Sequence, residues 1–198
     1  MHGRGWVFTP KEFLDLGTPG AIRLALLRLK RGQKIRRLAQ GLYDYPRVHK
    51  TLGMLAPNPD DVASALAAKT GSRIQPSGAR AANLLGLTQQ VPAQLVYLTD
   101  GPAQQVMIGS QLIKLKPARP SKFPASGTRA GLALQAILAM GAEADHDFIA
   151  RQLRRSLTAT DKSELATLTK HAPTWSHKLI EAITREPNGQ MGKSIGKR

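Results

Sequence analysis

The spacing of apolar and polar positions near the amino terminus predicts two short helices in close succession. Thr9 and Glu12 have the spacing of a capping box, so we expect a first helix over residues 10–16. Thr18, followed directly by a proline, repeats a helix start after a very short turn, and Gly32 is placed to end this second helix. One face of the second helix is apolar and carries Ile22, Ala25, Leu26 and Leu29.

Two β-rich stretches follow the second helix and indicate a hairpin. Residues 35–38 and 42–45 have the composition of short strands, with Gly41 near the bend, and the first of them is basic. Two tightly joined helices followed by a basic hairpin are typical of a winged helix-turn-helix, in which the second helix enters the major groove of DNA. We therefore expect a winged helix-turn-helix DNA-binding domain over residues 1–50.

The rest of the chain predicts a second, mixed domain over residues 58–198, after a loop rich in proline. Alternating apolar and polar residues indicate a small antiparallel sheet at about residues 73–116, and helical periodicity indicates helices at about residues 128–186. Residues 187–198 have little to bury, so a mobile tail is expected there. The predicted fold class is α+β, with an N-terminal winged helix-turn-helix, a small antiparallel sheet and a C-terminal helical region.

Positive charge is concentrated in the first domain, although the whole chain has a formal net charge of +16. Residues 1–50 carry 11 Lys or Arg against 3 Asp or Glu, residues 51–142 carry 8 against 3, and residues 143–198 carry 10 against 7. This gradient is typical of a protein that binds nucleic acid through its amino-terminal part. Membrane-surface binding is not favoured, because aromatic residues make up only 5% of the chain, and no signal or spanning segment is found, so we expect a cytoplasmic protein.

Eight residues of the first domain are the candidate DNA contacts. Arg23 is the expected base reader, because it lies on the polar side of the second helix, toward its start. The other candidates lie on the same helix or on the hairpin and suit backbone or groove-edge contacts: Thr18, Gly20, Arg28, Lys30, Arg36, Arg37 and Gln40. For each residue singly, the alternative is an ordinary solvated surface. Leu24 and Leu27 interrupt the polar side, and they could pack on the hairpin, on a preceding segment or on a second copy of the chain.

The sequence shows no pattern of catalytic or metal-binding residues. It has no cysteine, its five histidines are scattered, and no glycine-rich phosphate loop or nucleophile motif is present. Ser77 precedes a predicted short helix and is expected to cap it rather than to act as a nucleophile. We therefore expect no cofactor, no metal site and no enzymatic activity.

Three motifs resemble the AbiEi-type antitoxins of type IV toxin–antitoxin systems. They are the LLRLKRG run at the end of the second helix, the RRLAQGLY hairpin, and the later segment SGARAANLLGL, with VYLTDG beyond it. The resemblance covers roughly residues 5–116. It implies a winged helix-turn-helix that represses its own operon and a C-terminal domain that counteracts a nucleotidyltransferase-like toxin. The chain departs from the family pattern at Leu24 and Leu27, where polar residues are more familiar.

The partners expected on this basis are double-stranded promoter DNA and a cognate nucleotidyltransferase-like toxin. A homodimer on paired half-sites is expected, because one copy would read too short a stretch of DNA. Two alternatives stay open: a stand-alone winged-helix transcriptional regulator, and an RNA-binding protein, since net charge does not separate DNA from RNA.

Overall fold

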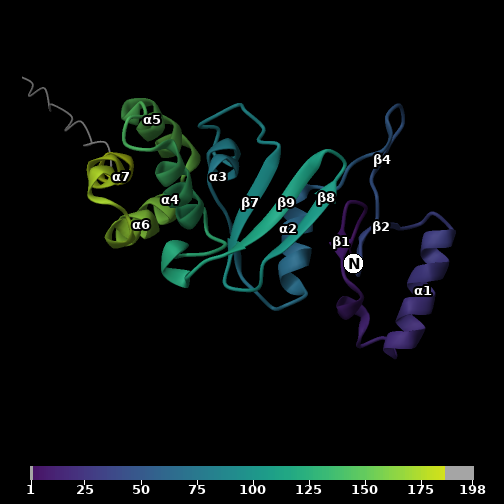
Figure 1. Ribbon diagram of the computed structural model, residues 1–198. Coiled ribbons are helices and arrows are strands. Elements are labelled where there is room, and N and C mark those ends of the chain that lie inside the picture. The colour runs from purple at the N-terminus through teal and green to yellow at the C-terminus, as the bar shows by residue number, and fades with distance from the viewer. Residues whose placement is uncertain (1, 186–198) are drawn as a thin grey trace, which may run out of the picture.

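The protein is an α+β chain whose parts follow one another along the molecule (Figure 1). The computed structural model describes residues 2–185. An amino-terminal head, defined here as residues 2–55, lies at one end and contains the long helix α1. A four-stranded sheet with helix α2 against one face occupies the middle, and a group of helices forms the other end.

The head is built on a small antiparallel sheet with the strand order β1-β3-β2. The outer strand β1 precedes α1 in the chain, and the other two strands form the predicted hairpin after it. A second hairpin, β4–β5, follows where the sequence predicted only a loop rich in proline. The elements of the head are β1 (Val7–Phe8), the 3₁₀ helix η1 (Pro10–Phe13), α1 (Pro19–Arg31), β2 (Arg36–Ala39), β3 (Leu42–Asp44), β4 (Val48–His49) and β5 (Gly53–Met54).

The predicted second helix is confirmed, whereas the predicted first helix is wrong in type and length. The Thr18 hydroxyl accepts a hydrogen bond from the backbone N–H of Ala21 at 3.3 Å, and Gly32 ends α1. The Glu12 carboxylate likewise accepts from the Thr9 N–H at 2.9 Å, so the expected cap exists. The segment nevertheless forms only η1, none of whose residues is buried. Phe13 is only partly buried against the small core of the head, and a single turn with so little buried surface has little to extend it into an α-helix.

The central sheet is mixed rather than purely antiparallel as predicted, with the strand order β6-β7-β9-β8. Two of its ladders are antiparallel, but β7 and β9 run parallel. Ile113 and Leu115 of β9 are fully buried, whereas Val106 is the buried residue of β8, so the more apolar strand takes the inner position. The elements of this layer are α2 (Pro59–Ala68), β6 (Ile74–Pro76), α3 (Ala79–Leu84), β7 (Gln94–Thr99), β8 (Gln104–Ile108) and β9 (Gln111–Pro117).

One hydrophobic core joins the head to the central sheet. Val7 and Leu42 of the head pack in the same buried cluster as Val62 and Leu66 of α2, and Leu95 of β7 belongs to it as well. A smaller cluster, formed by Phe8, Ile22, Leu26 and Ile35, holds α1 against the head sheet. The core therefore continues across the segment between residues 50 and 58, where the sequence predicted a domain boundary.

The carboxy-terminal part is helical, as predicted for residues 128–186, up to the end of its last helix at residue 184. Its helices enclose a separate core that also includes α3, in which Leu134, Ile137, Ile149 and Leu153 are fully buried. The predicted tail, residues 187–198, lies outside the described residues. No helix between residues 2 and 185 is long and apolar enough to cross a membrane. The elements are η2 (Pro120–Lys122), α4 (Arg129–Met140), α5 (His146–Ser156), α6 (Ala159–Thr167), η3 (Leu168–His171), η4 (Thr174–Ser176) and α7 (His177–Thr184).

Candidate nucleic-acid interface

A hollow of about 1060 Å³, here called the basic hollow, lies between α1 and the β2–β3 hairpin. Its apolar lining comes largely from α1 and includes Leu24 and Leu27, while cationic side chains approach from both α1 and β2. Of the eight predicted DNA contacts, five line it: Gly20, Arg23, Lys30, Arg37 and Gln40. The structure thus brings together residues that are up to 20 positions apart in the sequence.

Most of the surface of α1 is open. Only Ile22 and Leu26 of this helix are buried, and Gly20 and Arg23 are exposed. Arg28 is exposed as well, but it does not line the basic hollow. The remaining candidate on this helix, Thr18, uses its hydroxyl to cap α1, so its role in the structure is to define where the helix starts.

Arg36 points into the head rather than out of it. Its Nη2 lies 2.6 Å from Oδ2 of Asp44, whose side chain is only 1% exposed, and its Nε donates to Oδ1 of the same carboxylate at 3.1 Å. Nη2 also donates to the backbone carbonyl of Leu55 at 2.9 Å. The two residues lie directly opposite each other in the β2–β3 ladder. Arg36 therefore supports the hairpin and the following segment. This role was not predicted from the sequence, although the acidic Asp44 in the second predicted strand was a signal for it.

The turn of the β2–β3 hairpin is fastened to α2. Lys69 Nζ donates to the carbonyl of Gln40 at 2.8 Å, and Gly41 takes the left-handed conformation, with φ of 64°, that a tight turn requires. Burial lowers the pKa of Lys69 below its usual value, as expected for an ammonium group packed against the protein. The predicted wing tip is thus held at the base of the head instead of standing free.

The opposite side of α1 borders an apolar hollow of about 540 Å³. Trp6 and Phe13 form part of its wall, and Ala25 and Leu29 of α1 face them across it. Both α1 residues are exposed, although the sequence placed them on the buried face. The head contributes too few apolar residues to cover that whole face.

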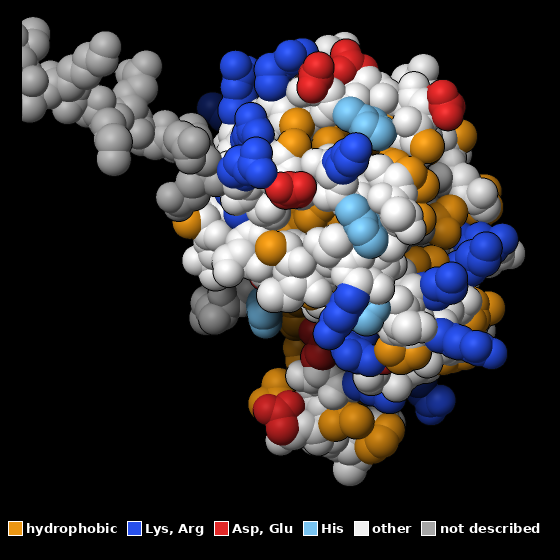
Figure 2. All heavy atoms as spheres, turned by 90° about the vertical axis from the view of Figure 1, so that its left-hand side faces the viewer, with side chains coloured by type: hydrophobic (Ala, Val, Ile, Leu, Met, Phe, Trp, Pro, Cys, Tyr) orange, Lys and Arg blue, Asp and Glu red, His pale blue; other side chains and the backbone are white. Residues whose placement is uncertain are grey.

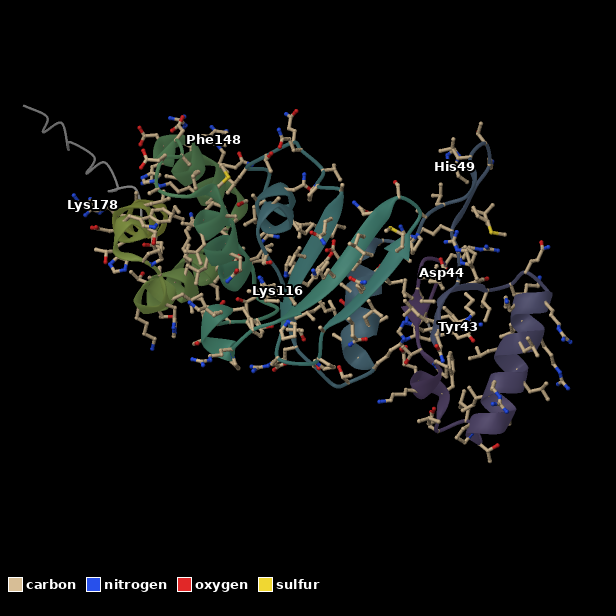
Figure 3. All side chains as sticks on the ribbon, viewed as in Figure 1. Tyr43, Asp44, His49, Lys116, Phe148 and Lys178 are labelled. Atoms are coloured by element: carbon tan, nitrogen blue, oxygen red, sulfur yellow. The ribbon has the colours of Figure 1, made fainter. Side chains whose placement is uncertain are left out.

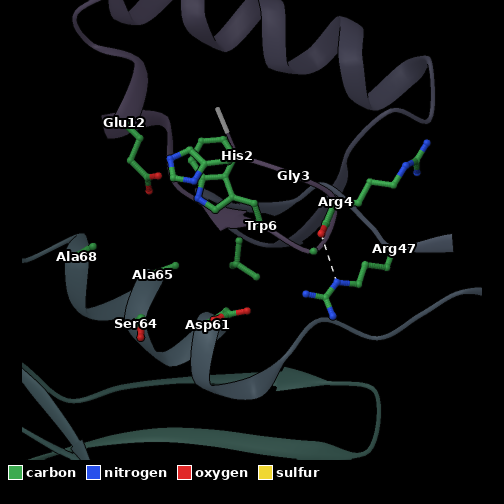
Figure 4. Close-up of a pocket in the computed structure, with 12 residues that line it drawn as sticks. His2, Gly3, Arg4, Trp6, Glu12, Arg47, Asp61, Ser64, Ala65 and Ala68 are labelled. Carbon is green, nitrogen blue, oxygen red and sulfur yellow. Dashed lines mark hydrogen bonds between the residues drawn. The ribbon is translucent and has the colours of Figure 1, made fainter. Parts of the chain in front are cut away.

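A third hollow, of about 510 Å³, lies between residues 2–7 and α2 and has mixed charge (Figure 4). Glu12, Asp61 and Arg47 line it, and Arg47 Nε donates to the carbonyl of Arg4 at 3.3 Å. A lining that combines both signs is poorly matched to a polyanion. Among residues 2–185, no group of three or more His, Asp or Glu side chains is placed to hold a metal ion.

A polar network below the head connects α2, α3 and β7. The Asp60 carboxylate accepts a hydrogen bond from the fully buried Tyr97 hydroxyl at 2.5 Å and forms an ion pair with Arg80. Burial and the Asp60 carboxylate raise the pKa of Tyr97 above its usual value. Burial alone would lower the pKa of Arg80, but the hydrogen bond to Asp60 and its charge raise it overall. These groups are already satisfied by one another, which is the pattern of a structural clamp.

Ser77 does not cap α3 as predicted. The cap position is Gly78, and the Ser77 hydroxyl instead donates to the carbonyl of Val96 at 3.4 Å. Gly78 has a φ of 59°, a backbone conformation that glycine adopts without strain. The SGARAANLLGL segment therefore serves to join α3 to β7.

The helical end does not form a second basic surface. Between residues 143 and 185 there are seven Lys or Arg and six Asp or Glu. Figure 2 looks onto this end of the molecule and shows basic and acidic side chains interleaved there. In the part of the chain that the structure describes, the head is therefore the region with the clearest excess of positive charge.

Comparison with known proteins assigns the chain to a family. No curated protein matches this sequence at a significant level. Residues 1–165 match the model of a family described as "Family of unknown function (DUF6088)", and these residues include the whole head and the central sheet. Because the match extends over most of the chain, the protein belongs to the DUF6088 family.

Proposed function

We propose that the protein is a DNA-binding transcriptional regulator whose head places α1 in the major groove of duplex DNA. The observation that carries this proposal is the basic hollow, which gathers Arg23, Lys30 and Arg37 along the exposed side of α1. An α-helix fits the major groove, and residues near its start are the usual base readers.

The topology of the head supports a winged helix-turn-helix. A strand, a short helical turn, a longer helix and a hairpin follow in that order, and the first strand pairs beside the hairpin. In this assignment η1 and α1 are the two helical elements of the motif. The motif would be a shortened form, since η1 is a single 3₁₀ turn.

The residues around the basic hollow suit different parts of DNA. Arg23 is the proposed base reader, because an arginine fork can bind a guanine edge with two hydrogen bonds. Lys30 and Arg37 are proposed to contact phosphates, which fix the position of the protein without reading sequence. Leu24 and Leu27, whose exposed fractions are 48% and 40%, suit apolar contact with thymine methyl groups. Arg36 is a positioning residue in this proposal, because its guanidinium is committed to Asp44.

We further propose that the regulator is the antitoxin of a type IV toxin–antitoxin system and represses its own operon. The support is the resemblance over residues 5–116 to AbiEi-type antitoxins, since these residues form the head and the central sheet. The cognate nucleotidyltransferase-like toxin would then be counteracted through the sheet and the helical end. Two copies on paired half-sites are proposed for the repressing complex.

A double substitution, Arg23→Ala with Arg37→Ala, is expected to separate the two activities. It removes two exposed cations from the basic hollow, so repression of a reporter behind the chain's own upstream DNA should be lost. Rescue from the toxicity of the neighbouring gene should persist, because neither residue contributes to the buried clusters. The measurement is reporter expression and cell growth in parallel, and the variant Lys170→Ala, outside the head, is the control for repression.

Intact repression by the double variant would contradict the proposed interface, and loss of rescue would show that the two activities depend on the same residues. Deleting residues 1–50 is a poorer experiment. It would remove Val7 and Leu42 from the core that they share with α2 and so damage the rest of the protein.

A further inference from the structure

The β4–β5 hairpin is a projecting arm of the head that the sequence did not predict. It extends beyond the head sheet at the same end of the molecule as α1 (Figure 1). Figure 3 shows His49 on this arm, well separated from Tyr43 and Asp44 in the adjoining sheet. Its two strands pair only with each other among the described strands. We call this element, residues 47–55, the arm.

The arm has a defined shape despite its small size. Nδ1 of His49 accepts hydrogen bonds from the backbone N–H groups of Thr51 and Leu52, at 3.2 and 3.3 Å, and so organises the tip. Gly53 follows with φ of 69°, and the Leu55 N–H donates to the Arg47 carbonyl at 2.9 Å to close the base. Such a preorganised tip loses less conformational freedom on binding than a flexible loop would.

The side chains of the arm combine cations with exposed apolar groups. Arg47 and Lys50 are exposed, and no acidic residue occurs between Asp44 and Asp60. Leu52 at the tip is 73% exposed, and the strand residues Val48 and Met54 are exposed too. Lys50 lies beside the apolar tip, whereas Arg47 lies at the base of the arm, where its Nε donates to the Arg4 carbonyl. An apolar tip next to a cation has the composition of protein segments that enter the minor groove, where apolar side chains contact sugars and base steps while cations contact the backbone.

The arm borders the proposed DNA-binding surface. Lys30 and Arg37, which line the basic hollow, also line a smaller hollow of about 270 Å³ together with Met54 of β5. Arg36 also connects the arm to the head sheet, because its guanidinium binds both Asp44 of β3 and the carbonyl of Leu55 at the end of the arm. The arm is therefore attached to the β2–β3 hairpin and lies beside the end of α1.

We propose that the arm is the wing of this protein: it contacts the DNA backbone through Lys50 and inserts Leu52 into the minor groove next to the major-groove segment held by α1. This inference rests on the proposed function and adds a second contact element to it. The β2–β3 turn, the position expected for the wing, is tied to Lys69 and does not take this part.

A second copy of the chain is the less favoured occupant of the arm. Each strand of the arm has only two residues, which offers a very short edge for pairing with another strand. Two arms would also bring Arg47 and Lys50 of both copies together, with no acidic residue of the arm to compensate. A polyanion satisfies these charges directly.

The test compares Lys50→Ala and Leu52→Ser with the wild-type chain in titrations of a duplex of about 30 base pairs from its own upstream DNA. Lys50→Ala should weaken binding by about five- to tenfold near 0.1 M salt and reduce the salt dependence by about one ion. Leu52→Ser should weaken binding by about fivefold and leave the salt dependence unchanged. Matched controls are Lys170→Ala and Val91→Ser, which alter an exposed lysine and an exposed aliphatic residue away from the head and should bind normally.

Hydroxyl-radical footprinting of the same complexes supplies the readout that affinity alone does not give. Both arm variants should lose protection of the minor groove beside the site and keep the protection centred on α1. Normal affinity and footprint of the arm variants, with binding lost in Arg23→Ala, would overturn the arm and leave the proposed function standing. Failure of the wild-type chain to bind any duplex would overturn both. A loss of affinity that accompanies conversion of a dimer to a monomer in sedimentation would assign the arm to a second copy and overturn the proposal.

Discussion

Replacing Asp60 with alanine is expected to lower the free energy of unfolding by about 2–4 kcal/mol. The Asp60 carboxylate is the shared partner of the Tyr97 hydroxyl, which is fully buried, and of Arg80, whose side chain is only 13% exposed. Without the Asp60 carboxylate, the Tyr97 hydroxyl and the Arg80 guanidinium stay largely buried with too few hydrogen-bond acceptors. Leaving buried donors unsatisfied costs more free energy than the loss of the hydrogen bonds themselves. The measurement is urea unfolding monitored by circular dichroism.

Asp61→Ala is the matched control for this substitution. Asp61 is the next residue of the same helical turn, it is exposed, and its removal changes the net charge by the same amount. Only the interaction with the start of α2 is lost, about 0.3–1 kcal/mol. Equal destabilisation by the two substitutions would show that the hydrogen bonds of Asp60 with Tyr97 and Arg80 add no stability to its interaction with the start of α2.

Arg36→Ala is expected to destabilise the head by about 2–4 kcal/mol. The substitution leaves the carboxylate of Asp44 buried and unpaired and removes the hydrogen bond to the Leu55 carbonyl. The solvent exposure of the Arg36 side chain, 32%, places the expected loss below that of a fully buried pair. The loss of stability is measured by hydrogen exchange of the backbone amides of β2 and β3. This method reports local opening, and the small core of the head can open without unfolding the separate core of the helical end.

Arg37→Ala provides the comparison, since it changes the neighbouring, exposed residue of the same strand. Arg37 Nε contacts only the nearby carbonyl of Ala39, at 3.3 Å, so stability should change by less than about 0.5 kcal/mol. DNA affinity should nevertheless fall, because Arg37 lines the basic hollow. Similar protection factors in both variants would contradict the assignment of Arg36 as a positioning residue.

The parts of the fold that depend on local chemistry could be predicted from the sequence. The start of α1 follows from a threonine and a proline in adjacent positions, and its end follows from Gly32. Strands β2 and β3 follow from short β-rich runs around a glycine, and the helical end follows from its periodicity. Each of these signals acts over a few residues, which is why one sequence suffices to find it.

The errors in sheet topology concern partners that are distant in the sequence. Val7 pairs with Asp44, which no local pattern indicates, and β9 lies between β7 and β8 because of how its apolar residues pack against α2. The same limit applies to the candidate site. Exposure of Arg23 followed from the helix, but the ion pair of Arg36 and the anchoring of Gln40 by Lys69 depend on contacts across the fold. The arm is a local hairpin, but its strands have only two residues each, which is too short to leave an alternating pattern in the sequence.

The proposed reading of duplex DNA by α1 is tested by binding of the chain to its own upstream DNA. Fluorescence anisotropy would compare a duplex from this DNA, a scrambled duplex of equal composition and a structured RNA. We expect the upstream duplex to bind at least about a thousandfold more tightly than the scrambled one and not to be displaced by the RNA. We also expect Arg23→Ala with Arg37→Ala to abolish this preference. Equal affinity for all three nucleic acids, or an unchanged preference in the double variant, would contradict the claim that α1 and the basic hollow read duplex DNA.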